Sequence, residues 1–348
     1  MQAVHAVVGL DELDLEDHRF AIRSYLPHDR LAASLAKVGM LFPPWVWAGG
    51  DRKYTVVDGF KRFQWAQEAR LESILCLVFP EICTYEALLL RRVEGKLFGL
   101  TLNAAEKAQI IAKLISAMPR QMIPDHLFPA LGIPQRDEAI ARWCGLSQAG
   151  ENLLKAVASG EIAERTALEL STWDEEEGAE ILAILEQLRC SASIQMEIVE
   201  RIREIALREN RARLAVLRQP ELAAILKEQR SNHRQKTEAL RTLLTRWRFP
   251  RLSVREERFV RKLSAASLPS AIRLAPPPAF EGENWQLRLT FASPQELREL
   301  LEEVANLANS PLLESILSSE GPGEKSQPFA TKSTKSTKDT SISVRVSS

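Results

Sequence analysis

Residues 54–79 read YTVVDGFKRFQWAQEARLESILCLVF, and this stretch decides the fold of the N-terminal part of the chain. The apolar run Tyr54–Val57 predicts a strand, which stops at the turn signal Asp58-Gly59. From Phe60 the apolar residues recur every three to four positions, which predicts a helix. The run Ile74–Phe79 then predicts a second strand. Strand, helix and strand in this order indicate a small mixed α/β unit.

Two cations, Lys61 and Arg62, fall in the first turn of the predicted helix. Cations at a helix start oppose the helix dipole, so they are poorly placed for stability. They are well placed to meet an anion that sits on the exposed N–H groups of that turn. The sequence therefore leaves two interpretations open: a phosphate-binding turn, or two solvated basic side chains on the surface.

The composition is ordinary for a soluble protein. The chain has 348 residues, of which 45% are hydrophobic and 26% charged, so it has room for two or three domains. No apolar run approaches the roughly 20 residues that span a bilayer, and the N-terminus lacks the layout of a signal peptide. The four cysteines, Cys76, Cys83, Cys144 and Cys190, show no metal-ligand spacing. We expect a cytoplasmic protein with buried free thiols, no metal site and no membrane contact.

The net charge of zero hides an uneven distribution. Residues 1–198 carry 20 Lys/Arg and 28 Asp/Glu, residues 199–262 carry 18 and 8, and residues 263–348 carry 8 and 10. A basic middle segment on an otherwise acidic chain is typical of a surface that binds a polyanion. The alternative is a solvated helical face rich in arginine.

Two short helices are predicted around Gly132, within a region that is helical from the N-cap Asn103 onward. The first ends at Gly132 and the second starts near Gln135. Two short helices joined by a short glycine-containing turn are the outline of a helix-turn-helix. Gln135, Arg136 and Arg142 would then be the side chains that read DNA bases, because Gln135 and Arg136 open the second helix. For Arg142 an ion pair with Glu138 is the alternative.

The remaining patterns complete an α+β prediction. Residues 1–20 are expected to be irregular, and long helices are expected at 194–217 and 220–247. A strand at 285–291 and a helix at 294–308 follow. The predicted parts are a mixed α/β domain at 1–100, a helix-turn-helix domain at 101–190, a basic helical segment at 191–265, a strand-helix unit at 266–317 and a disordered tail at 318–348.

The order of these elements over about 22–190 resembles the ParB family of partition proteins. Gly59-Phe60-Lys61-Arg62 is similar to the family's Gly-Glu-Arg-Arg box. Glu94-Gly95-Lys96-Leu97-Phe98 is similar to its Glu-Asn-x-x-Arg box, and Leu102–Ala108 to the Leu-Asn-Pro-x-Glu-x-Ala helix start that follows. The helix-turn-helix falls where the family has it.

The resemblance implies a protein that binds a centromere-like DNA site, dimerises through its C-terminal strand and helix, and binds CTP with Mg²⁺. It also implies a nucleoid location and a ParA-type ATPase as a possible partner. Phe60, Gly95 and Phe98 depart from the nucleotide boxes. We therefore expect phosphate binding at Gly59, Lys61, Arg62 and Glu94 with little or no hydrolysis, and we assign no catalytic residue.

Two other classes stay open. A phosphotransferase or nucleotide hydrolase could use the same N-terminal fold, with Asp58 or Glu94 as its carboxylate. A non-catalytic adaptor would have neither activity. A sulfiredoxin-like reductase would need a cysteine at the glycine turn, and this sequence has none there. Our preferred interpretation is a ParB-like DNA-binding protein in plasmid or chromosome partition, or in a related regulatory role.

Overall fold

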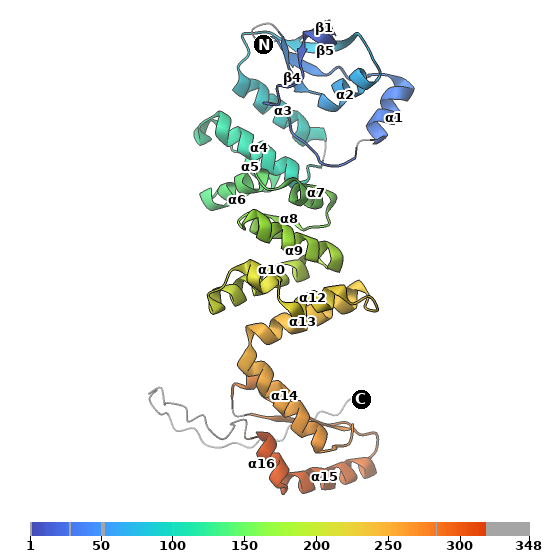
Figure 1. The fold of residues 1–348 in the computed structure, drawn as a ribbon, viewed down its shortest axis with the longest axis vertical. Coiled ribbons are helices and arrows are strands. Elements are labelled where there is room, and N and C mark those ends of the chain that lie inside the picture. The colour runs from blue at the N-terminus through green and yellow to red at the C-terminus, as the bar shows by residue number, and fades with distance from the viewer. Residues whose placement is uncertain (1, 28, 50–52, 100, 283, 318–348) are drawn as a thin grey trace. The chain divides into compact units, whose positions relative to one another are not determined.

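The computed structural model describes residues 2–27, 29–49, 53–99, 101–282 and 284–317. The chain divides into two compact units, Met1–Arg248 and Phe249–Ser348. Strands and helices both occur in each unit, which confirms the predicted α+β class (Figure 1). The predicted disordered tail, 318–348, lies outside the described residues. None of the helices in the described ranges has the length and apolar character needed to span a bilayer.

A five-stranded sheet with the order β1-β5-β3-β4-β2 forms the N-terminal end of the first unit. Its strands are β1 (Val4–Gly9), β2 (Leu13–Asp14), β3 (Trp45–Trp47), β4 (Tyr54–Asp58) and β5 (Ser73–Phe79). The expectation that residues 1–20 are irregular was wrong, because β1 pairs antiparallel with β5 along its whole length. Val4 and Val7 remain 61% and 68% exposed, so this edge strand forms by backbone pairing and shows no hydrophobic alternation.

Helices cover both faces of this sheet. On one face α2 (Phe60–Glu68) packs Phe63 and Ala66 against Val56 and Cys76. Burial of the Cys76 thiol raises its pKa to about 11. The other face meets α3 (Tyr85–Gly99) and α4 (Ala104–Ala117), and its side chains join the large core that continues into the helical region. Helix α1 (Asp29–Val38) lies beside α2.

The rest of the first unit is helical (Figure 1). Its helices are α5 (Leu127–Leu131), α6 (Asp137–Ser147), α7 (Glu151–Ser159), α8 (Glu164–Leu170), α9 (Glu175–Leu188), α10 (Ala192–Glu209), α11 (Arg213–Leu217), α12 (Pro220–Lys227) and α13 (His233–Arg248). The two long helices predicted at 194–217 and 220–247 were wrong. Asn210 takes a left-handed conformation (φ 50°) that ends α10, and a turn after Lys227 separates α12 from α13. Arginine-rich turns keep a high helix propensity, so sequence alone does not show these breaks.

Most arginines of the basic segment are paired with carboxylates. Arg241 donates from Nε to both carboxylate oxygens of Glu197 and from Nη2 to Oε2, at 3.0–3.2 Å, and Arg201 approaches the same carboxylate at 2.9 Å. Arg213 pairs with Glu177 at 2.7 Å. These contacts join α9, α10, α11 and α13, so much of the basic charge is compensated by carboxylates of the same unit.

The second unit packs a helix and a two-stranded sheet around three aromatic rings. Its elements are α14 (Pro250–Ala265), β6 (Ile272–Ala275), β7 (Gln286–Leu289), α15 (Pro294–Ala308) and α16 (Pro311–Leu317). Phe259, Phe280 and Trp285 lie with ring centroids 5.7–6.1 Å apart. Strand β6 was not predicted from the sequence. It brings Arg273 directly opposite Arg288 across the antiparallel pair.

We predict that Glu197→Gln lowers the stability of the chain. The change leaves Arg201 and Arg241 without their shared charge partner, and we expect a loss of about 1 kcal/mol because the groups are only half-buried. Urea unfolding measures it, and the difference from wild type should shrink at high salt. Glu238→Gln, at a carboxylate that is 71% exposed, is the control and should change little. Equal effects of the two variants would contradict a structural role for the Glu197 pairs.

Candidate functional site

The predicted phosphate turn begins at Gly59, the N-cap of α2. Gly59 has φ 92° and ψ 24°, a left-handed conformation that other residues adopt only with strain. A Cβ atom here would also lie 2.6 Å from Cβ of Pro44. Backbone geometry and close packing therefore both require glycine at this turn.

Lys61 and Arg62, the predicted phosphate ligands, follow on the first turn of α2. Lys61 Nζ donates a hydrogen bond to Oγ of Ser24 at 2.8 Å. Burial lowers the pKa of Lys61, the Glu106 carboxylate opposes this shift, and Lys96 adds to it. Arg62 lies at the 4.0 Å limit of an ion pair with Asp58.

Arg92 on α3 is the unexpected member of this site. Its side chain is 4% exposed, and its guanidinium lies over the ring of Phe60 at 5.2 Å from the centroid. Nη1 is 3.4 Å from Asp58 Oδ1, but Nε and Nη1 have no hydrogen-bond partner among the described residues. Burial lowers the pKa of Arg92, and Asp58 and Glu106 oppose that shift. A buried guanidinium with open donors is costly in free energy, which makes Arg92 a candidate anion ligand.

A second ion pair completes the site. Lys96, one turn beyond Arg92 on α3, pairs with Glu106 at 2.8 Å. Glu106 also closes the capping box of α4 with Asn103, as the sequence predicted, and Asn103 donates to the Ser24 carbonyl at 2.8 Å. The site thus combines α2, α3, the start of α4 and the segment around Ser24. We call Asp58, Lys61, Arg62, Arg92, Lys96 and Glu106 the basic cluster.

The structure brings Gly59, Lys61 and Arg62 together but places Glu94 elsewhere. Glu94 is 3.4 Å from Nε2 of His126, which precedes α5. It lies two residues from both Arg92 and Lys96 on α3, so it points to a different side of the helix. Sequence reasoning missed Arg92, although the pair Arg91-Arg92 beside the apolar residues Leu88, Leu89 and Val93 was an available signal.

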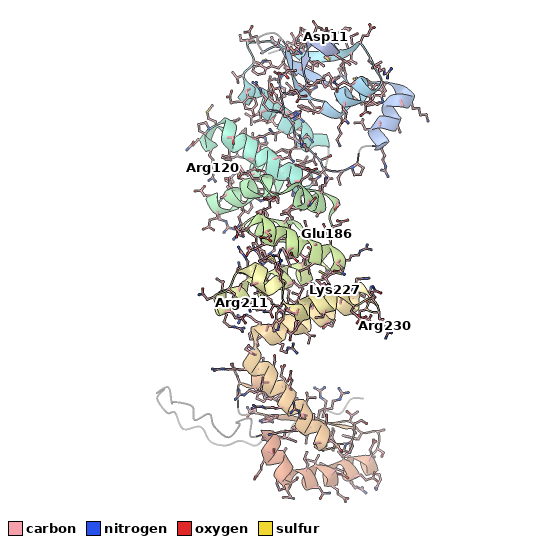
Figure 2. The ribbon with its side chains drawn as sticks, viewed as in Figure 1. Asp11, Arg120, Glu186, Arg211, Lys227 and Arg230 are labelled. Carbon is pink, nitrogen blue, oxygen red and sulfur yellow. The ribbon has the colours of Figure 1, made fainter. Side chains whose placement is uncertain are left out.

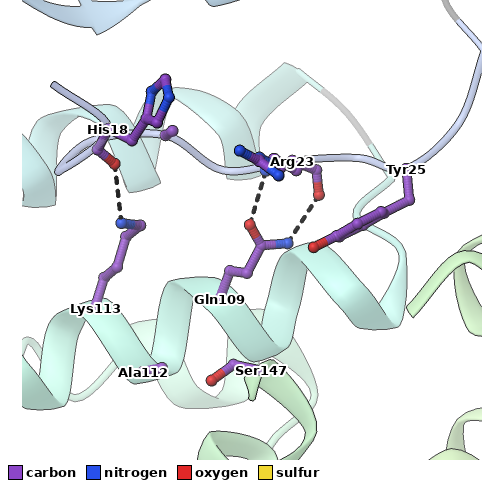
Figure 3. A pocket seen from close by; sticks show the side chains of 8 residues that line it. His18, Arg23, Tyr25, Gln109, Ala112, Lys113 and Ser147 are labelled. Atoms are coloured by element: carbon purple, nitrogen blue, oxygen red, sulfur yellow. Dashed lines mark hydrogen bonds between the residues drawn. The ribbon is translucent and has the colours of Figure 1, made fainter. Parts of the chain in front are cut away.

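An open cavity of about 310 Å³ lies beside this region (Figure 3). It is lined by His18, Ala21, Arg23, Tyr25, Gln109, Ala112, Lys113 and Ser147. Gln109 on α4 accepts from the Arg23 N–H and donates to the Arg23 carbonyl, both at 2.8 Å. Lys113 donates to the Arg19 carbonyl at 2.8 Å, and burial lowers its pKa. Arg23 and Lys113 give the wall a positive charge.

The predicted DNA-reading residues lie between α5 and α6 and on α6 itself. The second helix begins at Asp137, two residues later than expected. Arg120 holds this start, because its guanidinium contacts Asp137 and the Gln135 carbonyl and lies over the Phe128 ring. The Gln135 side-chain amide donates to the Asp125 carbonyl at 3.0 Å, so one of its two N–H donors is already used.

Arg136 and Arg142 are both exposed. Arg136 is the N-cap residue of α6, and Arg142 lies on the helix between the buried residues Ile140 and Trp143, with its own side chain exposed. Within the described ranges neither arginine has an ion-pair partner, so the alternative pairing of Arg142 with Glu138 does not form. These two guanidinium groups are available to a ligand.

Comparisons with known proteins give structural matches only. No known protein-family profile matches this sequence, and no curated protein does either. The chain is similar to the C-terminally truncated chromosome-partitioning protein ParB from Caulobacter crescentus complexed with CTP-gamma-S (18% identity, 52% of this chain and 98% of that chain, TM-score 0.25). It is also similar to the same protein complexed to the centromeric parS site (16% identity, 55% of this chain and 96% of that chain, TM-score 0.31). A third similar structure is the C2221 form of a Pnob8-like ParB-N domain (11% identity, 71% of this chain and 98% of that chain, TM-score 0.36). At these TM-scores no residue role is transferred.

We predict that Arg92→Met makes the chain more stable and removes its response to phosphates. An apolar side chain of similar length removes a buried charge with open donors, for a gain of about 1–2 kcal/mol. CTP should raise the melting temperature of wild type but not of this variant. Arg91→Met, at an exposed neighbour, is the control and should keep the CTP response. If Arg92→Met is less stable and still responds to CTP, Arg92 is a structural residue and not an anion ligand.

Proposed function

We propose that this chain is a ParB-like DNA-binding protein that acts in plasmid or chromosome partition, or in a related role that organises or regulates DNA. The observation that carries the proposal is a pair of exposed arginines of α6, Arg136 at its N-cap and Arg142 within it, which have no carboxylate partners among the described residues. Many arginines elsewhere in this unit are compensated by glutamates. Free guanidinium groups on a helix that follows a short helix and a turn fit base readout in the major groove.

Fixed geometry at the start of α6 supports the same function. Arg120 contacts Asp137 and the Gln135 carbonyl, so it neutralises an acidic residue that would otherwise repel DNA. It also fixes the turn that presents Arg136. A rigid recognition element loses less entropy on binding than a flexible one.

Nucleotide binding at the basic cluster is our second proposal, and the buried open donors of Arg92 favour it. Four cations and two carboxylates leave a net positive charge that suits the phosphates of CTP. The carboxylates do not suit Mg²⁺, because Asp58 faces Arg62 and Arg92 while Glu106 is held by Lys96 and Asn103. A metal ion would therefore come with the nucleotide. Asp58 faces Arg62 and Arg92, and Glu94 lies beside His126 outside the basic cluster. We therefore propose no catalytic residue in the cluster, and a phosphotransferase is the less favoured class.

We also propose a homodimer through the second unit, which would present two copies of α6 to DNA. Leu301 on α15 and Leu287 on β7 are 49% and 39% exposed. A small unit of a two-stranded sheet and helices gains stability when a second copy buries such exposed apolar side chains. A ParA-type ATPase as partner and a nucleoid location belong to the same proposal.

The DNA proposal predicts separate effects on preference and affinity. After selection of a preferred site from random duplexes, Arg142→Ala should weaken binding to that site by about 1–3 kcal/mol and leave a scrambled duplex unaffected. Lys155→Ala, at an exposed cation paired with Glu151, is the control. Fluorescence anisotropy gives both affinities. Absence of duplex binding by wild type at low salt would refute the proposal.

The dimer proposal predicts that Leu301→Lys produces a monomer. A charge at this exposed apolar position would be buried unpaired in the interface. Light scattering at micromolar concentration gives the mass, and Gln295→Lys on the same helix should remain dimeric. A wild-type chain that is already monomeric would contradict the proposal.

A further inference from the structure

The turn between α12 and α13 gathers basic side chains that the fold leaves uncompensated. Residues 199–248 hold thirteen Lys and Arg residues. Nine of them form ion pairs, namely Arg201, Arg203, Arg208, Arg211, Arg213, Arg218, Arg241, Arg246 and Arg248. The other four are Lys227, Arg230, Arg234 and Lys236, which have no carboxylate partner within the described residues. All four fall within ten consecutive residues, which we call the α12–α13 turn (227–236).

The nearest acidic residues do not neutralise these cations. Glu228, inside the turn, accepts a hydrogen bond from the backbone N–H of Arg230 at 2.9 Å and not from its guanidinium. Glu238, just beyond the turn, pairs with Arg241. Glu186 and Lys227, both labelled in Figure 2, are next in sequence to Gln187 and Leu226, which are hydrogen-bonded, but no ion pair within the described residues joins Glu186 to Lys227. Lys227, Arg230 and Arg234 are all exposed, so three positive charges face solvent together.

The turn is nevertheless held in one conformation. Its first part is fixed because the Leu226 carbonyl accepts from Gln187 of α9 at 2.9 Å and from Lys236. Its second part is fixed by the reciprocal capping bonds of Asn232 and Gln235 at 2.9 and 3.0 Å. The charges therefore lie on a segment that hydrogen bonds hold to the fold. Such a preorganised surface loses less conformational entropy on binding than a mobile charged loop does.

The composition of the turn selects the kind of partner. Its sequence, KEQRSNHRQK, contains no apolar residue. Insertion into a membrane surface needs apolar side chains next to the basic ones, and protein interfaces depend on buried aromatic or aliphatic anchors. Contacts to nucleic-acid phosphates need only cations and small polar donors such as Ser, Asn and Gln.

We propose that the α12–α13 turn is a second nucleic-acid contact, which binds backbone phosphates without reading sequence. Lys227, Arg230 and Arg234 supply the charge, and the polar side chains between them supply hydrogen bonds to phosphate and sugar. This surface adds affinity for any duplex, whereas α6 supplies preference for one site.

The test is the salt dependence of binding to a random-sequence duplex by the full chain. The triple variant K227A/R230A/R234A should reduce the slope of log affinity against log salt concentration by about two to three, because each phosphate contact contributes about 0.9. Its preference for the selected site over a scrambled duplex should not change. Circular dichroism confirms that the exposed substitutions leave the fold intact.

The matched control removes three exposed arginines that the fold already pairs, in R165A/R218A/R246A. It changes the net charge equally, and its slope should fall by less than about one. Equal slopes for the two triple variants, or an unchanged slope for K227A/R230A/R234A while wild type binds duplex, would overturn this inference and leave the role of α6 intact. Loss of site preference in K227A/R230A/R234A would also overturn it, because the turn would then read sequence.

Discussion

One continuous apolar core holds the first unit together, and the functional groups depend on it. The core runs from Phe20 and Val57 beside the sheet to Leu244 in α13. Because the same packed side chains support the basic cluster and α6, both sites are positioned by one body. Close-packed interiors transmit displacement, so a displacement of α3 would reach the helices packed behind it.

Charge compensation is the second organising feature of this unit. Glu177 on α9 and Glu197 on α10 neutralise arginines that come later in the chain, which explains why an acidic N-terminal part and a basic middle part occur in one protein. The uneven charge distribution along the sequence therefore largely reflects ion pairs between glutamates of earlier helices and arginines of later ones. Among the cations that this pairing leaves without a carboxylate partner in the described part of the unit are Lys227, Arg230 and Arg234 at the α12–α13 turn and Arg136 and Arg142 of α6.

The sequence predicted local structure well where one signal dominated. The turn at Gly59, the capping box of Asn103 and the helix 294–308 appear as expected, because conformational freedom, a reciprocal side-chain bond and strong periodicity each specify them locally. Strands β1 and β6 were missed because their pairing partners lie far along the chain. Arg92 was missed for a related reason: its burial depends on Phe60 and Asp58 of another element.

The segment around Arg19 and Arg23, which crosses α4, is held by hydrogen bonds to its main chain. Gln109 bonds the N–H and the carbonyl of Arg23, and Lys113 donates to the carbonyl of His18 (Figure 3). Lys113 also donates to the carbonyl of Arg19. Every amino acid offers the same carbonyl, so these bonds hold the segment in place whatever side chains it carries. The segment can thus exchange the side chains that it contributes to the cavity wall, while Gln109 and Lys113 of α4 keep its main chain in register.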